Sequence, residues 1–96
     1  MKFEWDPNKN KSNILKHNVS FEDARTVFDD KNAKYLYDTE HTYDEERFIV
    51  IGIAETIKQE LHVCYCMRGI NEEITRLISA RKATKQEIKL YMEGRI

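Results

Sequence analysis

Hydrophobic and polar positions divide the chain into a helical front, a sheet-forming middle and a closing helix. Phe3–Trp5 has the pattern of a short strand, and Asp6 followed by Pro7 is a favourable helix start. This first helix should run to about Lys16 and end at Asn18, which tolerates the left-handed backbone of a helix C-terminus. Ser20 and Asp23 form a capping box for a second short helix. Its apolar face, together with Trp5, is expected in the core: Phe21, Ala24, Val27 and Phe28.

Three apolar runs in the middle of the chain predict strands at Phe48–Ala54, Leu61–Arg68 and Ile74–Ala80. Short polar turns separate them, which indicates an antiparallel meander. The preceding residues 29–46 read as a long charged surface connection with a further short strand at Tyr35–Tyr37. The sheet is therefore expected to contain three to four antiparallel strands.

Thr84 and Glu87 form a capping box at the start of a closing helix that extends to about Glu93. Ile88, Tyr91 and Met92 follow at helical spacing and form a stripe suited to packing on the sheet. The predicted fold class is α+β, with two N-terminal helices, the antiparallel sheet and a C-terminal helix packed on that sheet.

The composition is that of one folded domain spanning residues 1–96, since 41% of the residues are apolar and 34% are charged. The polar start of the chain and the lack of a long apolar run predict a cytoplasmic protein without a signal peptide or membrane span. Cys64 and Cys66 lie two positions apart on one predicted strand, too far apart for a strain-free disulfide, and are expected as reduced buried thiols.

The net charge of −1 disfavours a general nucleic-acid binder, but the charges are unevenly distributed. Residues 22–46 contain nine acids and three bases, whereas residues 76–96 contain six bases and two acids. This asymmetry predicts one surface for an anion and another for a cationic partner.

Arg81 and Lys82 lie between the last predicted strand and the capped closing helix. Cationic side chains beside a helix N-terminus favour a phosphate or another anion. Arg68 also ends a strand, and it meets Arg81 only if the strand order or a bulge brings the two together. The two arginines are either a pair that stabilises a phosphate in a transition state or surface residues in weak ion pairs.

His17, beside Lys16, is the strongest candidate for proton transfer, because histidine exchanges protons readily near neutral pH. The alternative is that it caps the first helix at the negative end of its dipole. His41 and His62 have weaker claims. The sequence shows no metal-ligand spacing, glycine-rich phosphate loop or serine triad, so no cofactor is expected and catalysis should use acid–base and cationic groups.

The order of these motifs resembles the BrnT family of toxins from type II toxin–antitoxin systems. The matching residues are Trp5-Asp6, Lys9, Asn13, Lys16-His17, Val19, Phe21, Ala24, Asp38, His41, Glu46–Gly52, Arg68, Arg76–Thr84, Glu87 and Tyr91. They cover nearly the whole chain, and the block Ile78–Thr84 is the most specific among them.

The resemblance implies a small metal-independent endoribonuclease toxin with a RelE-like fold. It implies inhibition by a BrnA-like ribbon-helix-helix antitoxin, in a heterotetramer or larger complex that contacts operator DNA only through the antitoxin. RNA is then the substrate. On this interpretation Arg68 and Arg81 stabilise the phosphate, Lys82 assists and His17 transfers the proton, while the further candidates for substrate binding are Lys16, Glu22 and Tyr91.

Two other functional classes remain open at this point. The same arginines could serve an inhibitor that binds RNA or the ribosome without cutting. Alternatively, the acidic connection could dock a basic partner in a protein-interaction module whose arginines have ordinary surface roles. A neighbouring gene for a ribbon-helix-helix protein would favour a toxin over the interaction module.

Overall fold

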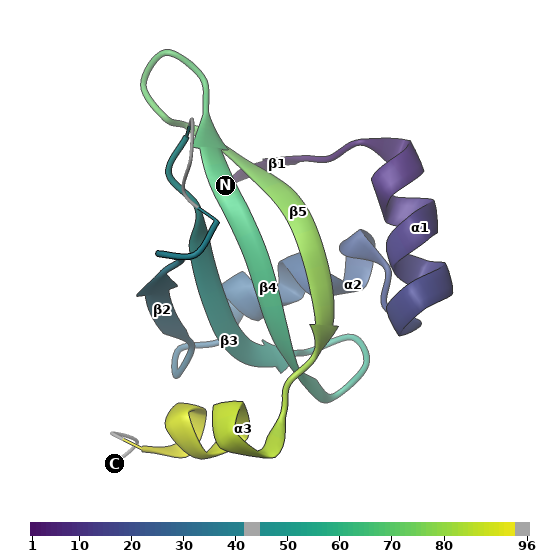
Figure 1. Ribbon diagram of the computed structural model, residues 1–96, viewed down its shortest axis with the longest axis vertical. Coiled ribbons are helices and arrows are strands. Elements are labelled where there is room, and N and C mark those ends of the chain that lie inside the picture. The colour runs from purple at the N-terminus through teal and green to yellow at the C-terminus, as the bar shows by residue number, and fades with distance from the viewer. Residues whose placement is uncertain (42–44, 94–96) are drawn as a thin grey trace.

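A five-stranded sheet forms the centre of the protein (Figure 1). The structure is a computed structural model that describes residues 1–41 and 45–93. The strands lie in the order β1-β5-β4-β3-β2, and all neighbours are antiparallel except β1 and β5, which are parallel. Their bounds are β1 Lys2–Glu4, β2 Lys34–Tyr37, β3 Phe48–Ala54, β4 Gln59–Arg68 and β5 Ile74–Lys82.

The α+β class and the meander β3-β4-β5 are confirmed, but the expected antiparallel sheet of three to four strands is corrected to a mixed sheet of five. The difference comes from β1, which pairs Lys2 with Ile74 and Glu4 with Arg76. Local periodicity cannot show this pairing, because its partners lie about 70 residues apart in the chain. The predicted strand Phe3–Trp5 is shifted by one residue.

Three α-helices and one 3-10 helix are found in the described parts of the chain: α1 Pro7–His17, α2 Phe21–Ala24, η1 Arg25–Asp29 and α3 Lys85–Met92. The predicted caps are confirmed. The Asp6 carboxylate accepts the Asn8 N–H at 2.8 Å, and Asn18 has the left-handed φ of 56°. The Ser20 hydroxyl accepts the Asp23 N–H, and Thr84 and Glu87 form the full capping box of α3. None of these described helices is long and apolar enough to cross a membrane.

The main core lies between one face of the sheet and the elements α2 and η1. Alternate residues of the strands point into it, including Val50, Leu61, Val63 and Leu77. Phe21, Ala24 and Val27 meet them from the helical side, each fully buried. Trp5 and Phe28 are partly buried against this core, as expected.

Asn13 fastens α1 to the edge of β5, next to the segment that β1 pairs with. Its side-chain amide donates to the Ala80 carbonyl at 2.7 Å and accepts the Ala80 N–H at 3.1 Å. The same amide donates to the Val19 carbonyl at 2.9 Å. The buried side chain thus acts as a short strand neighbour and fixes α1 against β5, which Figure 1 shows beside each other.

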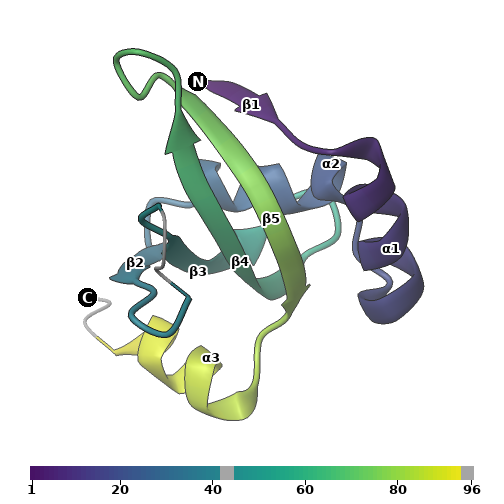
Figure 2. The same cartoon turned by 45° about the horizontal axis from the view of Figure 1, so that its top comes forward.

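The second face of the sheet is only partly covered, and α3 lies at one end of it (Figure 2). Tyr91 anchors α3, because its buried ring donates a hydrogen bond from the hydroxyl to Asp30 at 2.6 Å. Met92, predicted on the same packing stripe, is 52% exposed. The free thiols of Cys64 and Cys66 are buried, as the sequence predicts. The uncovered part of this face carries the polar side chains described next.

Candidate functional site

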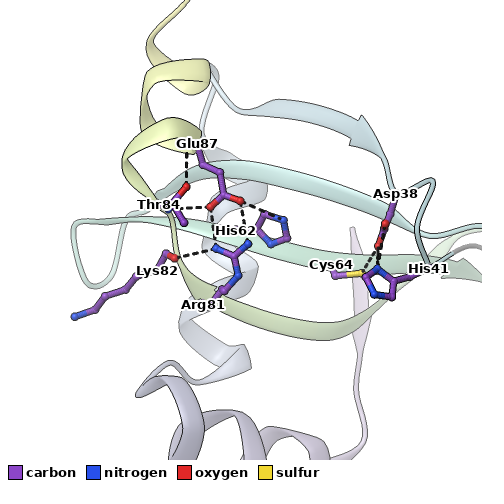
Figure 3. Close-up of polar contacts among 8 residues, drawn as sticks. All are labelled: Asp38, His41, His62, Cys64, Arg81, Lys82, Thr84 and Glu87. Atoms are coloured by element: carbon purple, nitrogen blue, oxygen red, sulfur yellow. Dashed lines mark hydrogen bonds and ion pairs between the residues drawn. The ribbon is translucent and has the colours of Figure 1, made fainter.

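A hollow of about 550 Å³ lies on the second face of the sheet, between the segment that follows β2 and the end of β5. Polar side chains dominate its lining, with Ile49 and Ile78 as apolar floor residues. The chemically active groups are Asp38, His41, Arg47, His62, Cys64 and Arg81, most of which Figure 3 shows. These residues come from four separate segments, so only the folded chain brings them together.

Strand alternation and register explain why these side chains share one surface. Successive strand residues point to opposite faces, so Leu61 and Val63 point into the core while His62 and Cys64 point to the opposite face. The pairing of β4 with β5 then sets Arg81 directly opposite His62. A register shift between Cys64 and Tyr65 marks an irregularity in this pairing beside the hollow.

The guanidinium of Arg81 is held by the carboxylate of Glu87 in a two-bond ion pair (Figure 3). Arg81 Nη1 donates to Glu87 Oε1 at 2.8 Å and Nη2 donates to Oε2 at 2.9 Å. Glu87 Oε1 also accepts the Thr84 N–H at 2.8 Å, which completes the cap of α3. One carboxylate therefore ties the helix start and the arginine into a single rigid unit.

The contacts within this unit shift the pKa values of its side chains. The hydrogen bonds from Arg81 are the main cause that lowers the pKa of Glu87 to about 2, and the Thr84 N–H adds to this effect. Glu87 in turn raises the pKa of Arg81. Burial and the charge of Arg81 lower the pKa of His62, whose Nε2 lies 3.7 Å from Glu87 Oε2. At neutral pH the unit thus holds a fixed cation, its counter-ion and a neutral imidazole.

Asp38 and His41 form a second polar group at the hollow. The His41 Nδ1 atom lies 3.1 Å from Asp38 Oδ2 and 3.2 Å from Oδ1, and the Cys64 thiol donates to Oδ2 at 3.8 Å. Asp38 is buried, whereas the His41 side chain is 57% exposed. Burial and the Asp38 carboxylate raise the pKa of Cys64 to about 11, so this thiol is not a nucleophile at neutral pH.

The structure does not bring Arg68 and Arg81 together. Arg68 pairs with Ile74 at the opposite end of β4, six residues beyond His62. At ~3.3 Å per residue, this places it about 20 Å along the sheet from Arg81. Its guanidinium is exposed and contacts Glu45 at 3.1 Å. A shared grip of both arginines on one phosphate, which the sequence left open, does not occur in this arrangement.

Two of the predicted substrate-binding residues lie away from the hollow. Glu22 is exposed on α2, on the other side of the sheet, and pairs with Arg25 at 3.2 Å. Tyr91 is the buried residue of α3; its hydroxyl contacts Asp30, and its side chain lines a different depression.

Lys82 follows Arg81 in β5, and its side chain points away from the Arg81–Glu87 pair (Figure 3). The strand alternation that directs Arg81 toward the hollow has this consequence for its neighbour. Lys16 and His17 are exposed on α1 and line a smaller hollow. That hollow adjoins the large one, since Ile78 and Ser79 line both.

Sequence reasoning gave His41 and His62 weaker claims and gave no chemical role to Asp38 or Arg47. The alternation of β4 could have assigned His62 to the face opposite the core. Its position across from Arg81 can be predicted only if the strand register is known. The position of residues 38–41 beside it can be predicted only if the fold of the charged connection is known. In residues 1–41 and 45–93, no three or more His, Cys, Asp and Glu side chains cluster as metal ligands would.

Comparison with known proteins adds a family to this geometry. Residues 5–87 match the family model described as "Ribonuclease toxin, BrnT, of type II toxin-antitoxin system". The fold matches the crystal structure of the Brucella abortus ribonuclease toxin BrnT with a TM-score of 0.65 and 28% sequence identity. This match covers 88% of the present chain and 99% of the Brucella chain. No curated protein matches the chain in sequence.

Proposed function

Because the chain belongs to the BrnT family of ribonuclease toxins from type II toxin–antitoxin systems, we propose that it is a metal-independent endoribonuclease whose catalytic centre is the large hollow. The observation that carries this proposal is the presence of a preorganised arginine and a carboxylate-bound histidine in one solvent-open depression. The enzyme acts on RNA in the cytoplasm and halts growth when it is not inhibited.

RNA cleavage by the neighbouring 2′-hydroxyl needs three things from a protein. A base removes the hydroxyl proton, cations stabilise the charge on the pentacovalent phosphorus, and an acid protonates the leaving 5′-oxygen. The products are a 2′,3′-cyclic phosphate and a free 5′-hydroxyl. Histidine and arginine side chains can supply all three without a metal ion.

Arg81 stabilises the phosphate in this proposal. Glu87 occupies the end of the guanidinium formed by Nη1 and Nη2, and the Lys82 carbonyl accepts a further Nη1 hydrogen at 3.2 Å. The Nε–H and the second Nη2 hydrogen make up the other fork of the group, and they have no acceptor among the described residues. That fork suits two oxygens of a phosphate, while Glu87 keeps the group in place.

The Asp38–His41 pair transfers the proton. A carboxylate that accepts from Nδ1–H selects the tautomer in which Nε2 carries the lone pair, so Nε2 of this half-exposed side chain can act as the base and later return the proton. His62, held neutral beside Arg81, is the second imidazole available to the reaction. Arg47 adds a further cation to the lining.

The residues that the sequence suggested as catalytic or substrate-binding differ in the role that they have in the proposed mechanism. His17 remains an alternative proton-transfer group at the adjoining hollow, and Lys16 remains a candidate for RNA binding. Lys82 contributes charge at a distance, because its side chain points away from Arg81. Arg68, Glu22 and Tyr91 lie outside the hollow, and the mechanism assigns them no step.

The partner is an antitoxin, as for the toxins of this family. We propose a BrnA-like ribbon-helix-helix protein that covers the hollow and supplies the contacts with operator DNA, in a heterotetramer or larger complex. The acidic residues 22–46 and the basic residues 76–96 give the toxin two oppositely charged regions for it.

A second function is a non-catalytic inhibitor that binds RNA through Arg81 without cutting it. One experiment separates the two. The toxin is purified away from its antitoxin and incubated with a single-stranded RNA, and the RNA ends are analysed by mass spectrometry. New cyclic-phosphate ends that disappear in Arg81→Ala and persist in Arg25→Ala support the enzyme; Arg25 is a matched arginine in an ion pair on the helical side. Binding without new ends supports the inhibitor, and equal cleavage by both variants refutes the role of Arg81.

A further inference from the structure

The smaller hollow, of about 230 Å³, lies between α1 and the edge of β5. Lys9, Ser12, Lys16 and His17 line it from the helix, and Ile78 and Ser79 line it from the strand. The same two strand residues also line the large hollow. A ligand that leaves the neighbourhood of Arg81 across Ser79 therefore enters this second depression directly.

The helical side of the smaller hollow is a cationic stripe. Lys9 and Lys16 are two helical turns apart and fall on one face of α1, with Ser12 between them. The helix contains no Asp or Glu, and none of its lysines is ion-paired with a described residue. The arginines at positions 25, 68, 76 and 81, by contrast, each have a carboxylate partner. The helix α1 therefore presents uncompensated positive charge beside β5.

The helix dipole opposes an anion at this place only weakly. Lys16 and His17 lie at the C-terminal end of α1, where the dipole is equivalent to about half a negative charge. Two lysine side chains carry about four times that charge with the opposite sign. The hollow consequently retains a net attraction for anions.

The distance between the stripe and the catalytic centre is fixed. The buried Asn13 amide binds both backbone polar groups of Ala80, the residue before Arg81. The stripe and the arginine are thus held on either side of the same short strand segment, and no hinge separates them. Such fixed placement lets two phosphates of one strand bind with little loss of conformational entropy.

We propose that the smaller hollow is a second phosphate subsite, in which Lys9 and Lys16 bind the backbone of the RNA strand next to the bond that is cut. The inference rests on the proposed function, since it assumes that Arg81 holds the cleaved phosphate. It names the substrate as a single strand that crosses β5 at Ser79. Ser12 offers a hydroxyl donor to the same phosphate.

The test compares two double variants that each remove two positive charges. Lys9→Gln/Lys16→Gln changes the stripe, whereas Lys11→Gln/Lys31→Gln changes exposed lysines that line neither of the two hollows. Binding of a single-stranded RNA with a 2′-deoxy block at the scissile position is measured by fluorescence anisotropy at several salt concentrations. Cleavage of the unblocked RNA is measured in parallel, and thermal unfolding verifies that each variant is folded.

Lys9→Gln/Lys16→Gln should weaken binding on the order of 10-fold and flatten the slope of log affinity against log salt by about 0.7, the contribution of one single-strand phosphate contact. Cleavage should lose kcat/KM mainly through KM. The control variant should behave like the wild type. If both double variants weaken RNA binding equally, or if the stripe variant binds like the wild type, the subsite proposal is wrong. Cleavage by the wild type would in that case still support the catalytic proposal. A wild type that neither binds nor cuts RNA overturns both.

Discussion

Replacing Glu87 by glutamine tests the connection between the closing helix and the arginine that we place at the phosphate. Glutamine also serves at the third position of a capping box, so the cap with Thr84 is kept while the ion pair with Arg81 is lost. The substitution therefore isolates the two charged hydrogen bonds of 2.8 and 2.9 Å.

The pKa of Glu87 sets the size of the effect on stability. One pKa unit corresponds to ~1.4 kcal/mol, so a shift from 4.5 to about 2 limits the stabilisation to roughly 3.5 kcal/mol. The Arg81 side chain is 36% exposed, and screening by solvent reduces the expected loss to roughly 1–2 kcal/mol. For a domain of this size, each kcal/mol lowers the melting temperature by about 4–8 °C.

The pH dependence has a definite direction. Because folding lowers the pKa of Glu87, its carboxylate stabilises the fold fully above pH 4.5 and loses this effect as the pH falls toward about 2. In urea unfolding, the Glu87→Gln variant should therefore be less stable than the wild type at neutral pH and nearly as stable as the wild type in strong acid. RNA cleavage at neutral pH should fall on the order of 10- to 100-fold, since Arg81 is no longer held in place.

Glu93→Gln, an exposed change at the end of the same helix, is the matched control and should alter neither property. The reasoning is refuted if Glu87→Gln unfolds at the same urea concentration as the wild type at neutral pH. It is also refuted if the difference between the two proteins stays constant down to the acid limit.

Four further outcomes test the rest of the account. Saturating EDTA should leave RNA cleavage unchanged, and activity that returns only with added magnesium would contradict it. His41→Gln should slow cleavage by about 10²- to 10⁴-fold, because the variant lacks the proposed proton-transfer group. Arg68→Ala should retain cleavage, because Arg68 lies at the other end of β4. Asn13→Ala should destabilise the protein by about 2–4 kcal/mol in urea unfolding, since both Ala80 backbone groups lose their partner.

Local chemistry in the sequence is sufficient to predict most element boundaries. Thr84 and Glu87 mark the start of α3 because a capping box satisfies backbone groups within four residues. Asn18 marks the end of α1 for a similarly local reason. Strand β3 begins and ends at the predicted residues. The whole strand is one continuous apolar run, which is typical of a strand that is covered on both faces.

The candidate site is less predictable because it depends on contacts between distant residues. Arg81 is identifiable from its position between a strand and a capped helix, but its partner Glu87 serves both the cap and the arginine. His62 becomes relevant only through the register that pairs it with Arg81. His41 and Asp38 lie in a charged connection whose path over the sheet has no signal in local periodicity.

The pairing of the two ends of the chain determines when the molecule can fold. Both β1 and Asn13 bind β5, across sequence separations of about 70 residues. A nascent chain that ends before Ile74 lacks the strand on which its N-terminal segment docks, and it also lacks Arg81 and Glu87. Such non-local contacts form late and slow folding. The proposed catalytic hollow is therefore assembled only after β5 and the start of α3 have left the ribosome, so a translation product that stops before Arg81 carries no formed site.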